Sequence, residues 1–248
     1  MENFNTVGFI TVRSSSTRLP NKCFLEFGNE ETVLSHVVMR CIYYGIEPIV
    51  CTSSDESDNP IEALAKKMNV KFFRGSLNNK LKRWLDCANY FSIKNFHTID
   101  ADDPFFDGDQ MKDSMNLLID NDYDCVCPTK SSSEGDASVG YSLTKEIIQR
   151  ALDGVEENTD TEMMWYFVEK VPNIKIYHMK NNSGFKLPIR LTLDFEEDYW
   201  LLSFIQRMLG TYATRDEINK LFLLNPDLAK INLFRNDEWK AAQLSKKI

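Results

Sequence analysis

Short apolar runs alternate with stretches of helical periodicity through the first half of the chain. Apolar residues at helical spacing predict helices over 32–44, 61–68, 77–91 and 109–119. The apolar runs between them predict buried strands at 6–12, 47–51, 70–73, 96–99 and 123–127. Strands separated by helices of this length indicate βαβ units. We therefore expect an α/β fold with a mostly parallel central sheet and helices on both faces.

The second half changes character after a small, polar stretch at 131–135. Its pattern predicts strands at 139–143, 174–178 and 189–193. It predicts helices at 144–152, 160–170, 196–209 and 216–224, with a last, weakly packed helix at 236–248. With no internal repeat and no long linker, we expect residues 1–248 to form one domain. Within it, 130–180 is expected to be an acceptor or dimerisation subregion, and 210–248 a helical C-terminal extension.

Composition narrows the class of protein. The chain has 248 residues, 43% of them hydrophobic, and a net charge of −8. This excludes global disorder and argues against binding nucleic acid mainly by charge. No apolar run reaches the roughly 18–20 residues of a membrane span, and residues 1–5 do not start a signal-peptide pattern. The six cysteines form no C-x-x-C pair, so we expect buried, reduced thiols in a cytoplasmic protein.

Candidate chemistry is concentrated in loops that follow the predicted strands at 6–12, 47–51 and 96–99. In parallel sheets, ligands bind beyond the carboxyl ends of the strands. The first loop carries Arg13, Arg18 and Lys22 around four consecutive hydroxyl residues. Hydroxyls, backbone N–H groups and the Arg fork suit phosphate oxygens, although the loop is neither a Walker A nor a G-x-G-x-x-G motif. The alternative is an exposed loop with ordinary solvated charges.

Two acidic segments could hold a metal ion. The loop 100–107 has four carboxylates in eight residues, and Asp194 ends the apolar run at 189–193. Magnesium prefers one or two carboxylates together with waters and substrate phosphates, so Asp102 and Asp194 could form such a site. The alternatives are a loop or cap role for Asp102, and an N-cap role for Asp194 with Glu197 in the capping-box position.

Four motifs, in order, resemble one family. VRSSSTRLPNK at 12–22 resembles the ARMGSTRLPGK motif of the cytidylyltransferases grouped with spore-coat polysaccharide biosynthesis protein F, which are related to the CMP-Kdo and CMP-sialic acid synthetases. The stretch 52–76 resembles that family's Ser/Thr-Asp loop, helix, strand and Arg-Gly-Ser. DADDPFFD at 100–107 is similar to its TGDCPLID, and IRLTLDFEEDYWLL at 189–202 to its LRLTVDTPEDLEL. The resemblance spans nearly the whole chain.

The resemblance implies a GT-A-like, Rossmann-like nucleotidyltransferase that uses CTP and Mg²⁺. Arg13 and Lys22 fall on the family's triphosphate-binding residues, with Arg18 alongside, and Asp102 and Asp194 fall on its metal-binding aspartates. We expect Arg13, Lys22 and Asp102 to be catalytic. The residues expected to bind the nucleotide are Arg13, Ser15, Ser16, Arg18, Lys22, Ser53, Asp55, Arg74 and Asp102.

The chain also departs from the family's pattern. Ser14-Ser15 replaces Met-Gly, Asn21 replaces the Gly before the lysine, and Asp100 is an additional carboxylate. The stretch 134–142 also differs. These changes are expected on the acceptor side of the site.

Three residues are candidates for the acceptor. They are Asp100, Arg190 and Glu162, the last reaching it from the second subunit of a homodimer. The alternative for Arg190 is an ion pair with Glu196 or Glu197.

The expected reaction is transfer of CMP from CTP to a sugar, an acidic sugar, or a sugar or polyol phosphate, with release of pyrophosphate. It would serve the biosynthesis of surface polysaccharide or glycan. Asp100-Ala101-Asp102 also satisfies the Asp-x-Asp pattern of GT-A glycosyltransferases, so transfer from a nucleotide-sugar donor is one alternative. A non-catalytic nucleotide-binding homologue is another.

Overall fold

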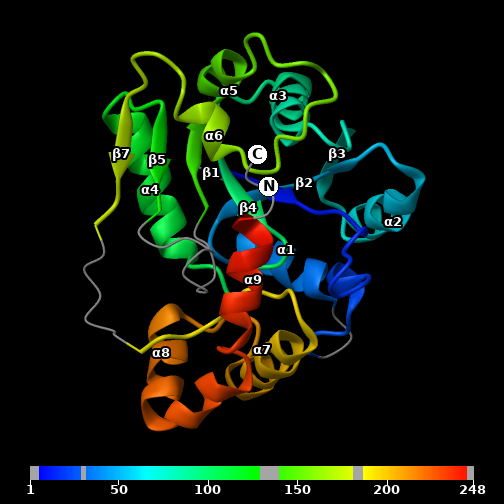
Figure 1. The fold of residues 1–248 in the computed structure, drawn as a ribbon, viewed down its shortest axis with the longest axis vertical. Coiled ribbons are helices and arrows are strands. Elements are labelled where there is room, and N and C mark those ends of the chain that lie inside the picture. Colours follow the sequence, from blue (N-terminus) through cyan, green and yellow to red (C-terminus); the bar gives the residue numbers. More distant parts are fainter. Residues whose placement is uncertain (1–5, 29–31, 129–139, 181–186, 245–248) are drawn as a thin grey trace.

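The computed structural model describes residues 6–28, 32–128, 140–180 and 187–244. The predictions made for residues 1–5, 131–139 and 245–248 lie outside these ranges. Within them, seven strands form one sheet in the order β3-β2-β1-β4-β6-β5-β7 (Figure 1).

Half of the sheet is parallel, as the βαβ pattern predicts. In this half β1 lies between β2 and β4, and β2 lies between β1 and β3, and all three pairs are parallel. Their bounds are β1 Thr6–Thr11, β2 Ile46–Ser53, β3 Lys71–Gly75 and β4 Asn95–Asp100.

The other half is mixed. β5 (Cys125–Cys127) and β7 (Ile176–His178) are parallel, but β6 (Ser142–Thr144) lies between β4 and β5 and runs antiparallel to both. The structure therefore confirms a mostly parallel sheet and adds one reversed strand.

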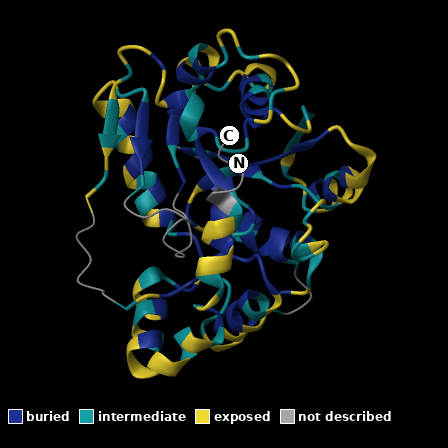
Figure 2. Ribbon diagram, viewed as in Figure 1, coloured by how far each residue is buried: buried dark blue, intermediate teal, exposed yellow. Residues whose placement is uncertain are grey.

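Helices cover both faces of the sheet, as expected. Phe9 of β1 packs with α3 (Lys80–Tyr90) and α5 (Lys145–Ala151), whereas the next residue, Ile10, packs with α1 (Val33–Tyr43) and α2 (Asn59–Lys67). Successive strand residues point to opposite faces, so one strand serves two cores. α4 (Gly108–Asp120) joins the α1 side through Met111. Figure 2 shows the buried residues concentrated in the strands and on the inner sides of these helices.

A third core lies outside the sheet, in the lower part of Figure 1. It is built by α7 (Glu196–Leu209), α8 (Arg215–Leu224) and the apolar residues Ile189, Leu191 and Leu193. The strand predicted at 189–193 is wrong, because these residues pair with no strand. The alternation of apolar and polar residues here comes from an extended segment whose apolar side chains pack on helices and not on a neighbouring strand.

Two further predictions need correction. The helix predicted at 160–170 is reduced to α6 (Trp165–Val168). The Thr161 hydroxyl accepts a hydrogen bond from the Leu81 N–H and donates to Asn79 Oδ1, and so holds the preceding residues as a loop on α3. The last helix is α9 (Arg235–Leu244), which follows a 3₁₀ turn at Pro226–Ile231 and is anchored by the buried Trp239.

The six cysteines are free and buried, as predicted. Across the part of the chain described, no helix is both long and apolar enough to cross a bilayer.

Candidate active site

The three polar loops meet at one edge of the sheet. Thr11 at the end of β1 is in register with Cys51 of β2 and with Asp100 of β4. Because these strands are parallel, the loops that follow them leave the sheet side by side. The prediction that loops 13–22, 52–59 and 100–107 gather at the carboxyl edge is confirmed.

Lys22 lies between two aspartates that are far apart in the sequence. Its Nζ donates to Asp102 Oδ2 at 2.6 Å, to Asp194 Oδ1 at 3.0 Å and to the Leu193 carbonyl at 2.9 Å. Burial alone would lower the pKa of Lys22, but the two carboxylates outweigh it and raise that pKa above its ordinary value. The ammonium is therefore held charged at the point where both acidic segments converge.

The residue before Lys22 sets the direction of the chain. Asn21 adopts a left-handed backbone with φ 54°, and a 3₁₀ turn, Lys22–Phe24, starts directly after it. Glycine and asparagine are the residues that adopt this conformation most readily. Asn21, which stands where the family's motif has Gly, thus suits the turn that directs Lys22 at the aspartates.

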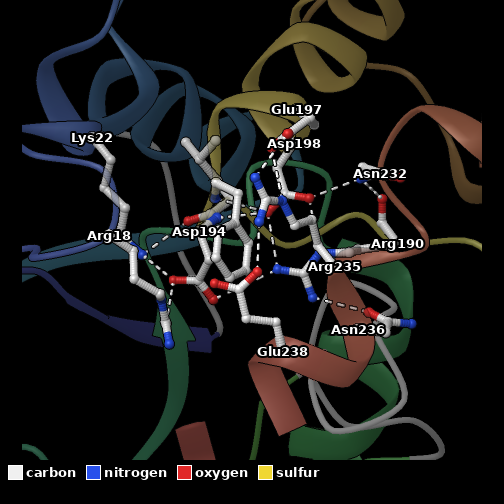
Figure 3. A network of polar contacts seen from close by, with 12 residues as sticks. Arg18, Lys22, Arg190, Asp194, Glu197, Asp198, Asn232, Arg235, Asn236 and Glu238 are labelled. Atoms are coloured by element: carbon white, nitrogen blue, oxygen red, sulfur yellow. Dashed lines mark hydrogen bonds and ion pairs between the residues drawn. The ribbon is translucent and has the colours of Figure 1, made fainter. Parts of the chain in front are cut away.

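Arg18 joins the same group through Asp194. Its Nη2 lies 2.7 Å from Asp194 Oδ1, so that one oxygen accepts hydrogen bonds from both Arg18 and Lys22 (Figure 3). Burial opposes ionisation of Asp194, but Lys22 and Arg18 outweigh it and lower its pKa. Asp194 is 4% exposed and is held as a carboxylate.

The two carboxylates offer a donor set that suits a divalent cation. Both approach one cationic atom, Lys22 Nζ, closely enough to ligate a shared ion. Among the described residues, no group of three or more His, Cys, Asp or Glu side chains forms a protein-only metal cage. Mg²⁺ commonly binds through one or two carboxylates, with waters and phosphate oxygens completing its shell. The donor set of Asp102 and Asp194 matches that mode.

A second charged cluster lies beside the first. Arg13 Nη2 contacts Glu162 Oε2 at 3.0 Å, and Lys80 Nζ contacts Glu162 Oε1 at 3.3 Å. Lys80 and Arg13, in that order of importance, oppose the effect of burial and lower the pKa of Glu162 to about 2. Burial raises the pKa of Asp100 to about 6, with Asp102 and Glu162 adding to the rise and Lys80 opposing it. Arg13 therefore pairs with Glu162 and makes no direct contact with the aspartates.

The loop after β2 is organised by a carboxylate that the motif analysis did not single out. Asp58 Oδ1 accepts hydrogen bonds from the Ser14 N–H and hydroxyl, both at 2.8 Å. Its Oδ2 accepts from the hydroxyls of Thr52 and Ser53 and from the Ser53 N–H. Burial raises the pKa of Asp58, but these bonds outweigh it, so the net pKa is lowered. Asp58 thus ties the first loop to the second.

Replacing Asp58 with Asn is expected to lower the free energy of unfolding by about 2–3 kcal/mol, because an amide nitrogen faces donors that are buried. The contribution of the wild-type carboxylate is present above the ordinary Asp pKa of 3.8 and is lost as the pH falls through its lowered value. Urea unfolding between pH 2 and pH 7 measures both effects. Asp120→Asn, at an exposed position of α4, is the matched control. Equal stability of the two variants at pH 7 would refute the role given to Asp58.

The other residues predicted to bind the nucleotide are Ser15, Ser16, Arg74 and Asp55, and their surroundings differ. Ser15 is exposed, and Ser16 Oγ accepts a hydrogen bond from the Leu19 N–H at 3.3 Å. Arg74 holds the second loop by donating to the carbonyls of Ser53 and Asp55 at 2.9 and 2.7 Å. Asp55 in turn accepts from the Ser57 N–H at 2.9 Å.

Arg190 is not available to an acceptor. Its side chain is fully buried, and its guanidinium makes a two-point ion pair with Asp198 at 2.8 and 2.9 Å. The alternative prediction, an ion pair of Arg190 with Glu196 or Glu197, is also wrong, because the partner is Asp198. At the start of α7, Asp198 accepts a hydrogen bond from the Phe195 N–H at 3.0 Å. Asp198 therefore occupies the capping-box position that the sequence analysis assigned to Glu197.

Sequence reasoning missed Asp58, Lys80 and Asp198. Asp58 stands shortly before the helix predicted at 61–68, and Asp198 stands near the start of the helix predicted at 196–209. Such positions favour carboxylates that cap a helix, as Asp198 does at the start of α7, whereas Asp58 makes no side-chain capping bond and bonds Ser14, Thr52 and Ser53 instead. Lys80 gave no signal beyond its place near the start of the helix predicted at 77–91.

Comparison with known proteins identifies the family. Residues 7–228 match the family model described as cytidylyltransferase. The chain belongs to the cytidylyltransferase family. It is therefore a nucleotidyltransferase enzyme, and the resemblance seen in the motifs is confirmed.

Individual relatives agree with this assignment. The chain is 24% identical to the spore coat polysaccharide biosynthesis protein SpsF of Bacillus subtilis, over 89% of this chain and 95% of that protein. A cytidylyltransferase from Leptospira borgpetersenii superposes with a TM-score of 0.77 at 22% identity, covering 92% of this chain and 97% of that one. CMP:2-keto-3-deoxy-manno-octonic acid synthetase, complexed with CTP, superposes with a TM-score of 0.62 at 14% identity, covering 82% and 98%. These structures share the fold of this chain.

Proposed function

We propose that this cytidylyltransferase transfers CMP from CTP to a hydroxyl of a sugar, an acidic sugar, or a sugar or polyol phosphate. The acceptor oxygen forms a bond to the α-phosphorus as the bond to the bridging oxygen breaks, pyrophosphate leaves, and the hydroxyl proton is released to water. The observation that carries the proposal is Lys22 Nζ between Asp102 and Asp194, with Arg18 on the same oxygen of Asp194.

In this proposal, cations of the first loop bind the triphosphate. Lys22 exchanges its two carboxylate partners for β- and γ-phosphate oxygens, and Arg18 contributes a planar fork to the same group. Arg13 lies on the Glu162 side and faces the α-phosphate and acceptor end. Charge that builds on the leaving oxygens is stabilised by these fixed cations, and positioning accounts for most of the remaining rate.

Asp102 and Asp194 would hold Mg²⁺. When bound, this ion neutralises phosphate charge and polarises the reacting phosphoryl group. Asp194 is held in place by contacts with Arg18, Lys22 and Arg190. The side chain of Asp102 is 30% exposed, and in this proposal it faces the substrate. The pair therefore combines one rigid and one accessible ligand.

For the acceptor we retain Asp100 and Glu162. Both carboxylates lie in one charged cluster with Lys80, so hydroxyl groups of a sugar would find acceptors there. The expectation that Glu162 reaches the acceptor from a second subunit needs correction, because Glu162 pairs with Arg13 and Lys80 of its own chain. A homodimer, the roles of 130–180 and 210–248, and a single domain for 1–248 stay predictions. The name of one relative, a spore coat polysaccharide biosynthesis protein, supports an acceptor from polysaccharide biosynthesis, and that of the CMP:2-keto-3-deoxy-manno-octonic acid synthetase supports an acidic sugar.

CTP with Mg²⁺ is expected to raise the melting temperature more than ATP, GTP or UTP under the same conditions. A ligand that binds only the native state raises the free energy of unfolding by about 2.7 kcal/mol when its concentration is roughly 100 times its Kd. Differential scanning fluorimetry with each nucleotide measures the effect. Pyrophosphate release with a panel of sugars and sugar phosphates then tests turnover.

Three results would each decide against part of the proposal. An equal shift with every nucleotide would remove the preference for CTP. Release of a free nucleotide from a nucleotide-sugar donor would favour a glycosyltransferase. CTP binding without pyrophosphate release across the panel would favour a non-catalytic homologue.

A further inference from the structure

The segment that carries Asp194 is held by a buried ion pair. Arg190 and Asp198 are both fully buried and meet in a two-point pair, four residues either side of Asp194. Asp198 Oδ2 also accepts hydrogen bonds from the N–H groups of Asp194 and Phe195, at 2.9 and 3.0 Å. Arg190 Nη2 lies 3.8 Å from Asp194 Oδ2. The pair therefore fixes both the backbone and the carboxylate of Asp194.

Two asparagines from the end of the chain complete this pair. Asn232 Nδ2 donates to Asp198 Oδ1 at 2.9 Å and to the Arg190 carbonyl at 3.0 Å. Asn236 Oδ1 accepts from Arg190 Nη1 at 3.0 Å. Figure 3 shows both residues on the side of the pair away from Lys22. A buried ion pair is stable only when its remaining donors and acceptors are satisfied, so these asparagines are required partners.

A third residue of the same segment binds the loop from outside. Arg235 makes a two-point ion pair with Glu197 at 3.0 and 2.9 Å, and its guanidinium lies 4.8 Å from the centre of the Phe195 ring. Arg18 lies 5.5 Å from the same ring centre. Phe195, next to Asp194, is thus in contact with one arginine of the site and one of the C-terminal segment.

We propose that the C-terminal segment 232–239 positions Asp194 for binding of the metal ion and the triphosphate. The match to the cytidylyltransferase family model ends at residue 228, so these positioning residues lie beyond the part of the chain that the model covers. The inference rests on the proposed function for its catalytic consequence. Its structural part, that the segment immobilises the Asp194 loop, is independent of any substrate.

Asn236→Ala tests the proposal, because Asn236 is half-buried on a helix and its loss leaves the buried contacts of Asn232 intact. Asn236→Asp keeps an oxygen acceptor for Arg190 and serves as the conservative variant. Lys240→Ala, at an exposed position one turn along α9, is the control. The variants are compared by Mn²⁺ titration followed by electron paramagnetic resonance, by kcat and KM for CTP, and by NMR hydrogen exchange of the Asp194 and Phe195 amides.

We expect Asn236→Ala to weaken Mn²⁺ binding roughly tenfold, as loss of a residue that orients a metal ligand typically does. Its two amides should exchange at least several times faster, with kcat reduced more than KM is changed. Asn236→Asp should restore most of the affinity, and Lys240→Ala should match wild type. Unchanged amide exchange and unchanged Mn²⁺ affinity in Asn236→Ala would overturn the inference. Failure of the wild-type protein to bind CTP would instead overturn the proposed function, while the exchange rates would still decide whether the segment holds the loop.

Discussion

Replacement of Asp102 with Asn is expected to reduce CTP-dependent pyrophosphate release about a thousandfold, because a metal ligand contributes several kcal/mol to stabilisation of the transition state. The fold should remain intact, since the side chain of Asp102 is partly exposed and its ion pair is with Lys22 at the open side of the site. Turnover at saturating CTP and acceptor, together with the melting temperature, measures both expectations.

The matched control for this substitution is Asp109→Asn. Asp109 is 70% exposed and pairs with Lys112 on the surface of α4, so the same chemical change there should leave turnover within twofold of wild type. If Asp102→Asn retained more than a tenth of the wild-type activity, the assignment of Asp102 as a metal ligand would be rejected.

Replacement of Lys22 with Met is expected to have two opposite effects on ligand binding. Met keeps most of the volume of the side chain but removes the charge. CTP affinity should fall about a hundredfold, since charge-assisted contacts to phosphate are among the strong ones. Binding of Mn²⁺ to the nucleotide-free protein should become tighter, because the ammonium that occupies the space between the two carboxylates is gone.

Isothermal titration with CTP, and with Mn²⁺ alone, separates these effects. Lys82→Met is the control, because Lys82 pairs with Asp86 on the outer part of α3, away from the aspartates. Parallel weakening of both ligands would indicate that Lys22 only maintains the fold of the loop. Unchanged CTP affinity would remove Lys22 from the triphosphate site.

Much of the site could be predicted because it depends on strand ends. Once 6–12, 47–51 and 96–99 are identified as parallel strands, the loops after them must share an edge, and Lys22 and Asp102 come together without further information. Asp194 was paired with Asp102 because it ends the apolar run at 189–193, and the resemblance in the motifs supported that pairing, although the run is not a strand of the sheet. Its loop is joined to the sheet by a backbone hydrogen bond from Leu193 to the Asp102 carbonyl, 2.7 Å long, that no periodicity reveals.

The errors have a common physical origin. The period-two pattern at 189–193 reports burial of an extended chain, and it cannot distinguish pairing with a strand from packing against α7 and α8. Arg190 looked like a ligand-binding residue because a lone arginine beside a candidate aspartate carries no sign of its partners. Those partners include Asn232 and Asn236, which are more than forty positions away in the chain. Asp58 was missed for the same reason, since its donors come from the first loop and from the end of β2.

The two carboxylates around Lys22 come from two different parts of the molecule. Asp102 extends from the sheet, whereas Asp194 extends from the helical core formed by α7, α8 and residues 189–193. A small displacement of that core relative to the sheet would change the distance between the two carboxylates, and it would also disturb Lys22, which contacts both of them. The distance between the two carboxylates therefore depends on how the sheet and the helical core are placed relative to each other. A ligand that binds both carboxylates would hold these two parts together.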